Sequence, residues 1–128
     1  MPDRAQPRVI EPDESQERLL RAEGCFVLQA WGLPEDAGLS VARARVAPGE
    51  RTAWHCLEGV REIYLLAEGR GRVEVGSLGP REVGPGALVV IPPGVRQRIE
   101  NAGSEDLVFY CICTPAFADG CYRALEGA

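Results

Sequence analysis

Two residues stand out for the chemistry that they could do together: His55, the single histidine of the chain, and Glu62, seven positions later. A neutral imidazole and a carboxylate are ligands for first-row transition metals, and both can carry protons in catalysis. The stretch between residues 49 and 69 that contains them has a glycine at each end, and Glu62 opens an apolar run. Short apolar runs between glycine turns are typical of β-strands, so we expect the two side chains to lie on neighbouring strands.

The five cysteines are a second set of candidate ligands, but they are odd in number and follow no disulfide-framework spacing. They are Cys25, Cys56, Cys111, Cys113 and Cys121. The last pair before the C-terminal region, Cys111 and Cys113, forms C-x-C, which matches neither a zinc ribbon nor a thioredoxin motif. We interpret the cysteines as reduced thiols that serve partly as small core residues.

Composition excludes several classes of function. All fourteen basic residues are arginine, so Schiff-base chemistry and a lysine general base are ruled out. The net charge of −5, with arginines scattered among acids, argues against nucleic-acid and anionic-membrane partners. The sequence contains no apolar run of the roughly 18 to 20 residues that a membrane span needs. The N-terminus is polar and acidic, with no secretory signal pattern, so we expect a cytoplasmic protein.

At 128 residues the chain is expected to form one domain with an N-terminal extension. Residues 1–13 contain three prolines and predict an extended arm, and residues 14–21 predict a short helix capped by Asp13 or Ser15. Residues 25–31 have the composition of a strand. Such an apolar segment near a terminus either pairs with a second subunit, which would make the protein a homodimer, or packs on the core.

From residue 39 onward the sequence predicts only short strands separated by glycine and proline turns. The predicted strands are 39–47, 52–57, 62–67, 72–75, 81–83, 88–91, 97–100 and 107–114. Residues 84–87 and 92–95 place proline then glycine at the centre of a turn, as type II turns prefer. Many short strands without helices between them indicate an all-β sandwich or barrel and exclude a parallel α/β fold.

The spacing of the turn residues resembles the two motifs of the cupin family. In the first motif, Gly49, His55, Leu57, Glu62 and Gly69 are separated by five, one, four and six residues. In the second motif, Gly86, Pro92, Gly94, Gln97 and Asn101 are separated by five, one, two and three residues. The resemblance covers about residues 39–115 and implies a cupin double-stranded β-helix, a small jelly-roll barrel. We therefore expect an N-terminal arm and extension in residues 1–38, packed on the barrel or on a partner subunit, and the cupin barrel in residues 39–128.

The resemblance also implies a metal site, which this chain matches only in part. Cupins typically hold a metal on two histidines and a glutamate from the first motif and a histidine from the second. Carried over, these positions are His55, Leu57, Glu62 and Gln97, so two imidazoles are missing. His55, Glu62 and Gln97 would bind zinc, nickel, manganese or iron more weakly than a four-donor site. In the alternative, Gln97 forms hydrogen bonds with Glu62 or His55 in a polar cavity without metal.

Strand alternation predicts which side chains share the pocket. Leu57 faces the same way as His55, and Tyr64 and Leu66 face the same way as Glu62, so we expect all five in or around the pocket. Cys56 should point away from it, whereas one face of the strand with Cys111 and Cys113 could reach the cavity and supply thiolate ligands. For Arg43 and Arg45 we expect an outer sheet face.

Two functions are compatible with these residues. The first is a metal-assisted enzyme of the isomerase or lyase type that acts on a sugar or small acid, with Glu62 as ligand or base and His55 as ligand or proton carrier. A dioxygenase is disfavoured because the usual iron site takes two histidines. The second is a non-catalytic cupin that binds a small molecule in a degenerate, metal-free site. The fold alone does not decide between an enzyme and a binding protein.

Overall fold

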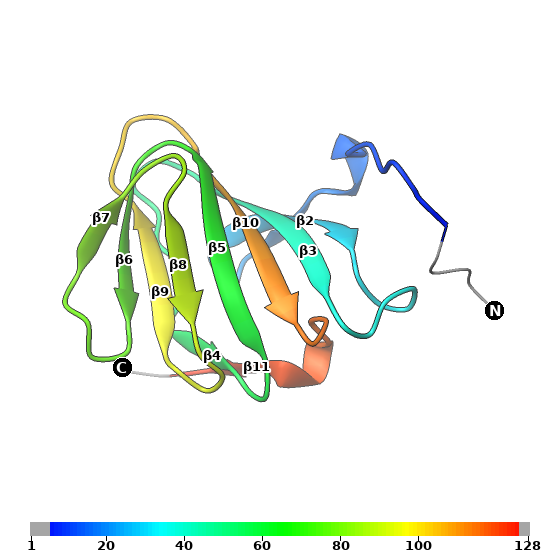
Figure 1. Ribbon diagram of the computed structural model, residues 1–128. Helices are drawn as coiled ribbons and strands as arrows, with labels where there is room; N and C mark the ends of the chain where they lie inside the picture. The colour runs from blue at the N-terminus through cyan, green and yellow to red at the C-terminus, as the bar shows by residue number, and fades with distance from the viewer. Residues whose placement is uncertain (1–5, 126–128) are drawn as a thin grey trace.

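The computed structural model describes residues 6–125, which form two antiparallel β-sheets packed face to face as a small barrel (Figure 1). The larger sheet has the order β1 (Arg18–Leu20), β2 (Cys25–Trp31), β3 (Ser40–Val46), β10 (Leu107–Thr114), β5 (Arg61–Glu68) and β8 (Leu88–Ile91). The smaller sheet has the order β11 (Tyr122–Ala124), β4 (His55–Leu57), β9 (Gln97–Asn101), β6 (Gly71–Val75) and β7 (Arg81–Val83). This architecture confirms the predicted all-β double-stranded barrel.

The predicted strands are confirmed, but their burial does not follow the sequence everywhere: in β8, an edge strand of the larger sheet, the apolar Leu88 and Val90 are exposed. Strand β5 shows the alternation: Glu62, Tyr64 and Leu66 are buried, whereas Leu65 is exposed. Strands β2, β7, β8 and β10 have the predicted bounds, and the others differ from prediction by a few residues at their ends. Period-two burial therefore directs one face of each long strand into the barrel.

The N-terminal extension contains less helix than predicted. Residues 14–21 form only a 3₁₀ turn, η1 (Glu14–Gln16), followed by β1. Asp13 caps this turn as expected, accepting a hydrogen bond from the Ser15 backbone at 3.1 Å. The chain then extends because pairing with β2 satisfies the backbone groups of Arg18–Leu20 across a sheet. The predicted arm over residues 1–13 falls partly outside the described residues.

At the C-terminal end, a second 3₁₀ turn, η2 (Asp119–Cys121), leads into β11. Neither element was expected from the sequence. Strand β11 pairs antiparallel with β4, with Tyr122 opposite Leu57 and Ala124 opposite His55. The C-terminal segment thereby closes one end of the barrel beside the residues of the first motif (Figure 1).

Gly69, the last glycine of the first motif, shows why the turn spacing is so specific. It has a φ of +83°, and an added Cβ would lie 2.6 Å from the backbone oxygen of Asp106. Both the backbone conformation and the close approach of the neighbouring chain require glycine. The turn chemistry that predicted the fold therefore has a steric cause.

The interior of the barrel has an apolar part and a polar part. The apolar part joins both sheets through the most deeply buried side chains, which include Val46, Leu66, Ile99, Leu107 and Phe109. The polar part contains the buried side chains of Ser40, His55, Glu62 and Gln97. Because folding usually places apolar groups in the interior, this buried polar group is the candidate functional site.

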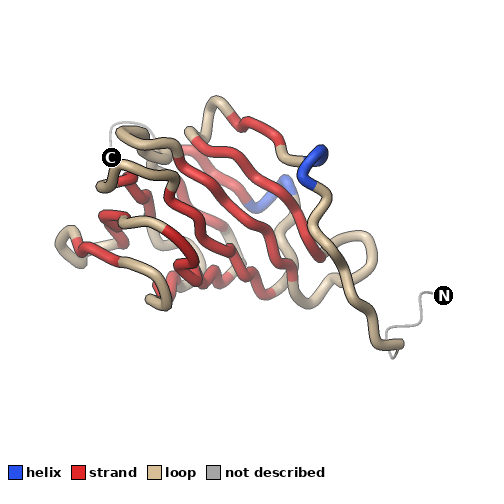
Figure 2. Tube along the Cα trace, turned by 90° about the horizontal axis from the view of Figure 1, so that it is seen from above, coloured by secondary structure: helices blue, strands red, loops and turns tan. Residues whose placement is uncertain are grey.

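The outer face of the larger sheet carries Arg43 and Arg45, as predicted. Glu14 and Glu17 of the N-terminal segment form ion pairs with them, the shortest at 2.6 Å between Arg43 and Glu14. Figures 1 and 2 show this segment at the β2–β3 end of the large sheet, far from β7. The ion pairs therefore hold the N-terminal segment against the outside of the barrel.

Strand β2 does not form the edge of the sheet along its whole length. Strand β1 pairs with Cys25, Phe26 and Val27, and within residues 6–125 no strand lies on that side of the second half of β2. The homodimer expected from this segment stays a prediction. No helix in the described part of the chain has the length and apolar character needed to cross a membrane.

Candidate functional site

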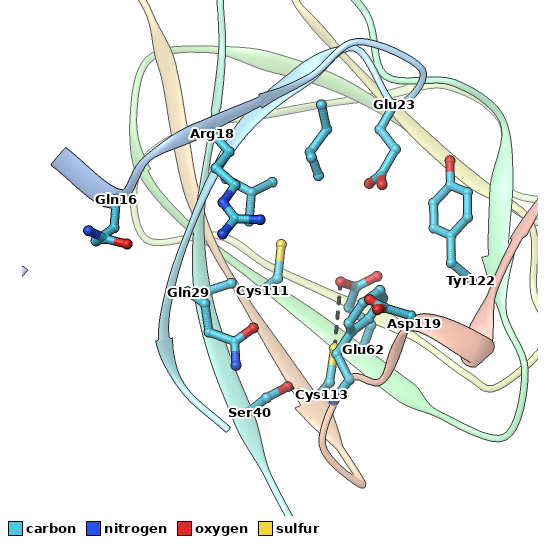
Figure 3. Close-up of a pocket in the computed structure, with 14 residues that line it drawn as sticks. Gln16, Arg18, Glu23, Gln29, Ser40, Glu62, Cys111, Cys113, Asp119 and Tyr122 are labelled. Carbon is cyan, nitrogen blue, oxygen red and sulfur yellow. Dashed lines mark hydrogen bonds between the residues drawn. The ribbon is translucent and has the colours of Figure 1, made fainter. Parts of the chain in front are cut away.

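A cavity of about 640 Å³ opens between the larger sheet and the C-terminal segment. Its wall combines the N-terminal segment, the inner face of the larger sheet and the region from η2 to β11 (Figure 3). The polar and thiol side chains of the wall are Gln16, Arg18, Glu23, Gln29, Ser40, Glu62, Cys111, Cys113, Asp119 and Tyr122. A cavity of this size with convergent polar groups is suited to a small molecule.

Glu62, on β5, is the most unusual group in this wall. The residue is only 6% exposed, and among the described residues its Oε1 has no hydrogen-bond partner. Its Oε2 accepts a hydrogen bond from the Cys113 thiol, with a sulfur–oxygen distance of 3.7 Å. Burial raises the pKa of Glu62 above its ordinary value of 4.5, although Gln97 and the two nearby thiols act in the opposite direction. Burial therefore favours the protonated carboxyl group.

Gln97, on β9, lies opposite His55 in the smaller sheet and is 0% exposed. The Tyr64 hydroxyl donates a hydrogen bond to Oε1 of Gln97, while Nε2 has no partner in the described part of the chain. Gln97 is close enough to Glu62 and His55 to affect both pKa values. The site thus contains an unsatisfied buried donor on Gln97 and an unsatisfied buried oxygen on Glu62, and such groups need a partner.

His55 is buried beside Gln97, but it is not part of the cavity wall. Tyr122, which does line the cavity, stacks on the imidazole with ring centroids 4.9 Å apart. Nδ1 of His55 lies 2.8 Å from the backbone oxygen of Ala53, so Nδ1 carries the hydrogen and donates it. Burial lowers the pKa of His55 below 6.5, which favours the neutral ring. The structure therefore places His55 behind Tyr122.

The cysteines are placed as strand alternation predicted: Cys111 and Cys113 line the cavity, and Cys56 does not. Burial raises the pKa of Cys113 to about 12 and that of Cys111 well above its ordinary value of 9.0. Both thiols are therefore protonated near neutral pH, which makes them poor nucleophiles. All five cysteines are free.

The donor set does not fit a divalent metal ion. Nε2 of His55 would be a suitable ligand, because Nδ1 donates to Ala53. Gln97, however, directs its oxygen to the Tyr64 hydroxyl, which leaves an N–H donor where a metal needs a lone pair. Within residues 6–125, no three His, Cys, Asp or Glu side chains group closely enough to hold a metal. The alternative of a polar site without metal agrees better with these atoms.

Of the residues expected in or around the pocket, only Glu62 and the two cysteines reach the cavity wall. Tyr64 and Leu66 point inward as predicted, but they pack in the apolar core, where the Tyr64 ring lies 4.6 Å from that of Phe109. Leu57 packs in a small apolar cluster with Val60. The cavity lies toward β1, β2 and the C-terminal segment, so residues deeper in the barrel do not border it.

Most other polar side chains of the wall were missed because they lie outside the two motifs. Arg18, Glu23, Asp119 and Tyr122 come from segments whose position depends on packing against the barrel. One signal was available in the sequence. Gln29 interrupts the apolar residues of β2 at a position that shares the inward face with Cys25 and Val27.

Fold and cavity together define a small double-stranded β-helix protein with a polar interior. The sequence matches the family described as "Cupin domain" over residues 42–113, and the chain belongs to this family. It is also 34% identical over 87 residues to the uncharacterized protein MJ1618 of Methanocaldococcus jannaschii. That match covers 68% of this chain and 69% of the relative.

Solved structures agree with the family assignment at the level of the fold. KdgF from Halomonas sp. superposes with a TM-score of 0.76 and 17% identity, covering 90% of this chain and 99% of KdgF. A PAC13 variant from Streptomyces, solved with uridine, superposes with a TM-score of 0.73 and 16% identity, covering 93% and 92% of the two chains. Pac13 is described as a nucleoside dehydratase.

Proposed function

We propose that the protein is an acid–base enzyme of the isomerase or lyase type, that it acts on a sugar or small acid in the cavity, and that it needs no metal. The observation that carries this proposal is the buried carboxyl of Glu62, whose Oε1 has no partner in residues 6–125 and which borders a cavity of about 640 Å³. A catalytic acid must hold a proton, and burial favours the protonated form by raising the pKa of Glu62 above 4.5.

The contacts of Glu62 indicate which atom transfers the proton. Because Oε2 accepts from the Cys113 thiol, the proton of the acid is held at Oε1, the free oxygen. Oε1 donates to an oxygen of the substrate, either a carbonyl or a leaving hydroxyl group. For a leaving hydroxyl group, the resulting carboxylate takes a proton from the neighbouring carbon, which completes the loss of water. For a carbonyl, the same removal gives an enediol, and the isomerisation is complete when Glu62 returns this proton to the former carbonyl carbon and takes the proton of the hydroxyl group on the neighbouring carbon.

Gln97, Tyr64 and His55 are positioning residues in this proposal. The Tyr64 hydroxyl fixes the Gln97 oxygen, so Nε2 of Gln97 is directed to an acceptor atom. Gln97 does not border the cavity, so this acceptor is not the substrate. Gln97 lies close enough to Glu62 and His55 to affect both pKa values, and we infer that it orients the Glu62 carboxyl group. His55 is not a proton carrier here, because it lies behind Tyr122 with its ring held by Ala53.

The structural neighbours make this chemistry reasonable for the fold. A nucleoside dehydratase catalyses a loss of water, and Pac13 has the same double-stranded barrel. The second candidate remains a non-catalytic protein that binds a small molecule. It is favoured by the same unpartnered oxygen, since Glu62 Oε1 can bind a ligand without transferring a proton.

The test uses proton NMR in heavy water to follow each candidate compound in the presence of the purified full-length protein. The compounds are aldoses, uronates, 2-hydroxy acids, amino acids and nucleosides. We expect at least one compound to exchange a carbon-bound hydrogen or to lose water. Glu62→Gln should lower this rate by about 10² or more, which is the usual contribution of a general acid.

Glu68→Gln is the matched control, because Glu68 is an exposed residue on the same strand and does not border the cavity. It should retain the wild-type rate. Equal rates for Glu62→Gln and wild type would refute the role of Glu62. Compounds that bind but remain unchanged would support the non-catalytic alternative.

A further inference from the structure

Among residues 6–125, Arg18 is the only basic side chain in the cavity wall. It lies opposite Val27 in the β1–β2 pair, and Val27 also lines the cavity, so both side chains are on the inner face. Figure 3 shows its guanidinium group directed into the cavity, on the same side as Gln16 and Gln29. Across residues 6–125, Arg18 forms no ion pair, in contrast to the paired Arg43 on the outer face.

Two acidic side chains lie on the facing side of the same cavity. Figure 3 places Glu23 and Asp119 across from Arg18, together with Tyr122. The backbone oxygen of Glu23 accepts a hydrogen bond of 3.0 Å from Ala53, which anchors it beside the smaller sheet. Asp119 belongs to η2 at the C-terminal end. In the described part of the chain, neither carboxyl group forms an ion pair, so the cavity holds opposite charges that do not neutralise each other.

Arg18 and Asp119 are exposed and Glu23 is half-buried, so water solvates these charges in the free protein, and a ligand that carries both charges would pair with both sides at once. Burial raises the pKa of Glu23, which shows that its carboxylate is disfavoured in the cavity without a cation nearby. An ammonium group would supply that cation, and a carboxylate would accept two parallel hydrogen bonds from the Arg18 guanidinium. A neutral sugar would leave both charges unpaired. A simple acid would pair with Arg18 but would face the acidic side without compensation.

We propose that the ligand of this cavity is a zwitterion with a carboxylate bound by Arg18 and an ammonium group bound by Glu23 and Asp119. Amino acids are the simplest molecules of this class. This inference rests on the proposed function, because it names the class of small acid that would be the substrate at Glu62. It also assigns specificity to residues outside the region of residues 42–113 that matches the cupin family.

The experiment measures binding to the full-length protein by saturation-transfer NMR and calorimetry. The probes are the common α-amino acids and the straight-chain ω-amino acids. Each binder is compared with its hydroxy acid, which lacks the amine, and with its decarboxylated amine. We expect at least one amino acid to bind and both analogues to bind about tenfold more weakly or worse, since each loses charge-assisted hydrogen bonds.

Variants then test the two sides of the cavity separately. Arg18→Gln and Glu23→Gln should each lower the affinity for the amino acid by about tenfold or more. Arg21→Gln is the matched control, because Arg21 is an exposed arginine three residues away and does not line the cavity. It should bind as the wild type does. A thermal melt of each variant, expected to match the wild type, verifies that a loss of affinity is not a loss of folded protein.

The inference is overturned if no amino acid binds, if the hydroxy acid or the amine binds as tightly as the amino acid, or if Arg18→Gln retains wild-type affinity. These results are distinguishable from failure of the proposed function. An amino acid that binds through Arg18 but is never converted would support the zwitterion site and refute the enzyme. A neutral sugar that is converted while no amino acid binds would do the reverse.

Discussion

Replacement of Tyr64 by Phe tests how the buried polar site is held together. The change removes one hydroxyl group and leaves Oε1 of Gln97, a fully buried residue, without its donor. A buried acceptor that loses its partner costs about 1–3 kcal/mol. We therefore expect Tyr64→Phe to lower the free energy of unfolding by about 1–3 kcal/mol, although the ring itself still packs on Phe109.

The assay is urea unfolding at neutral pH, which gives the free energy of unfolding by linear extrapolation. Gln97→Leu in the Tyr64→Phe background completes the test, because removing both partners of a buried hydrogen bond can be nearly neutral. The double variant should recover most of the loss. If Tyr64→Phe stays within about 0.5 kcal/mol of the wild type, as surface changes do, Tyr64 does not orient Gln97, and the Gln97 oxygen is free to face a metal.

Four further predictions concern metal, pH and assembly. Protein purified without a histidine tag should contain no stoichiometric zinc, nickel, manganese or iron, even after incubation with each; one metal per chain that is lost in His55→Ala would contradict the donor-set argument. Burial lowers the pKa of His55, so the contribution of His55 to the free energy of unfolding should be lost as pH drops below 6.5. Relative to wild type, His55→Gln should therefore gain stability in that range. Burial raises the pKa of Glu62, so the contribution of Glu62 to the free energy of unfolding is fully present below pH 4.5 and is lost as pH rises. Relative to wild type, Glu62→Gln should gain stability as pH rises. For either variant, a difference from wild type that does not change with pH would refute the prediction. Light scattering on the full chain should give the mass of two chains, as expected from the partly open side of β2, and the mass of one chain would refute the homodimer.

The fold could be predicted from the sequence because its signals are local. Gly69 must adopt a positive φ against a neighbouring backbone, and the inward positions of β5 alternate from Glu62 to Leu66. Such constraints are visible in single segments. The short helix expected in residues 14–21 failed because pairing with β2, a tertiary contact, overrides weak local propensity.

The site could be predicted only in part for the same reason. Glu62 and Gln97 lie on strands whose inward faces the sequence indicates, and both are buried there. The stacking of Tyr122 on His55 depends on β11 pairing with β4, which lies more than sixty residues earlier. No local pattern reports that contact. The position of His55 behind Tyr122 could therefore not be predicted, and its role stays a prediction.

Different parts of this cupin supply the barrel and the wall of the cavity. The motif strands supply the common barrel and the buried acid Glu62. The N-terminal and C-terminal segments supply the charged wall with Arg18, Glu23 and Asp119. Because these segments lie outside the matched region of residues 42–113, specificity can change without disturbing the barrel. The boundary proposed between residues 38 and 39 stays a prediction, since β1 and β2 before it pair in the same sheet as β3.

The protonation state of Glu62 tests the central proposal most directly. Carbon NMR on protein labelled at the glutamate carboxyl groups gives one titration curve per residue, and the curve missing in Glu62→Gln belongs to Glu62. We predict that this carboxyl group stays protonated as pH rises past its ordinary value of 4.5, because burial disfavours the carboxylate. A Glu62 that ionises at or below pH 4.5 would contradict its role as the acid of this site.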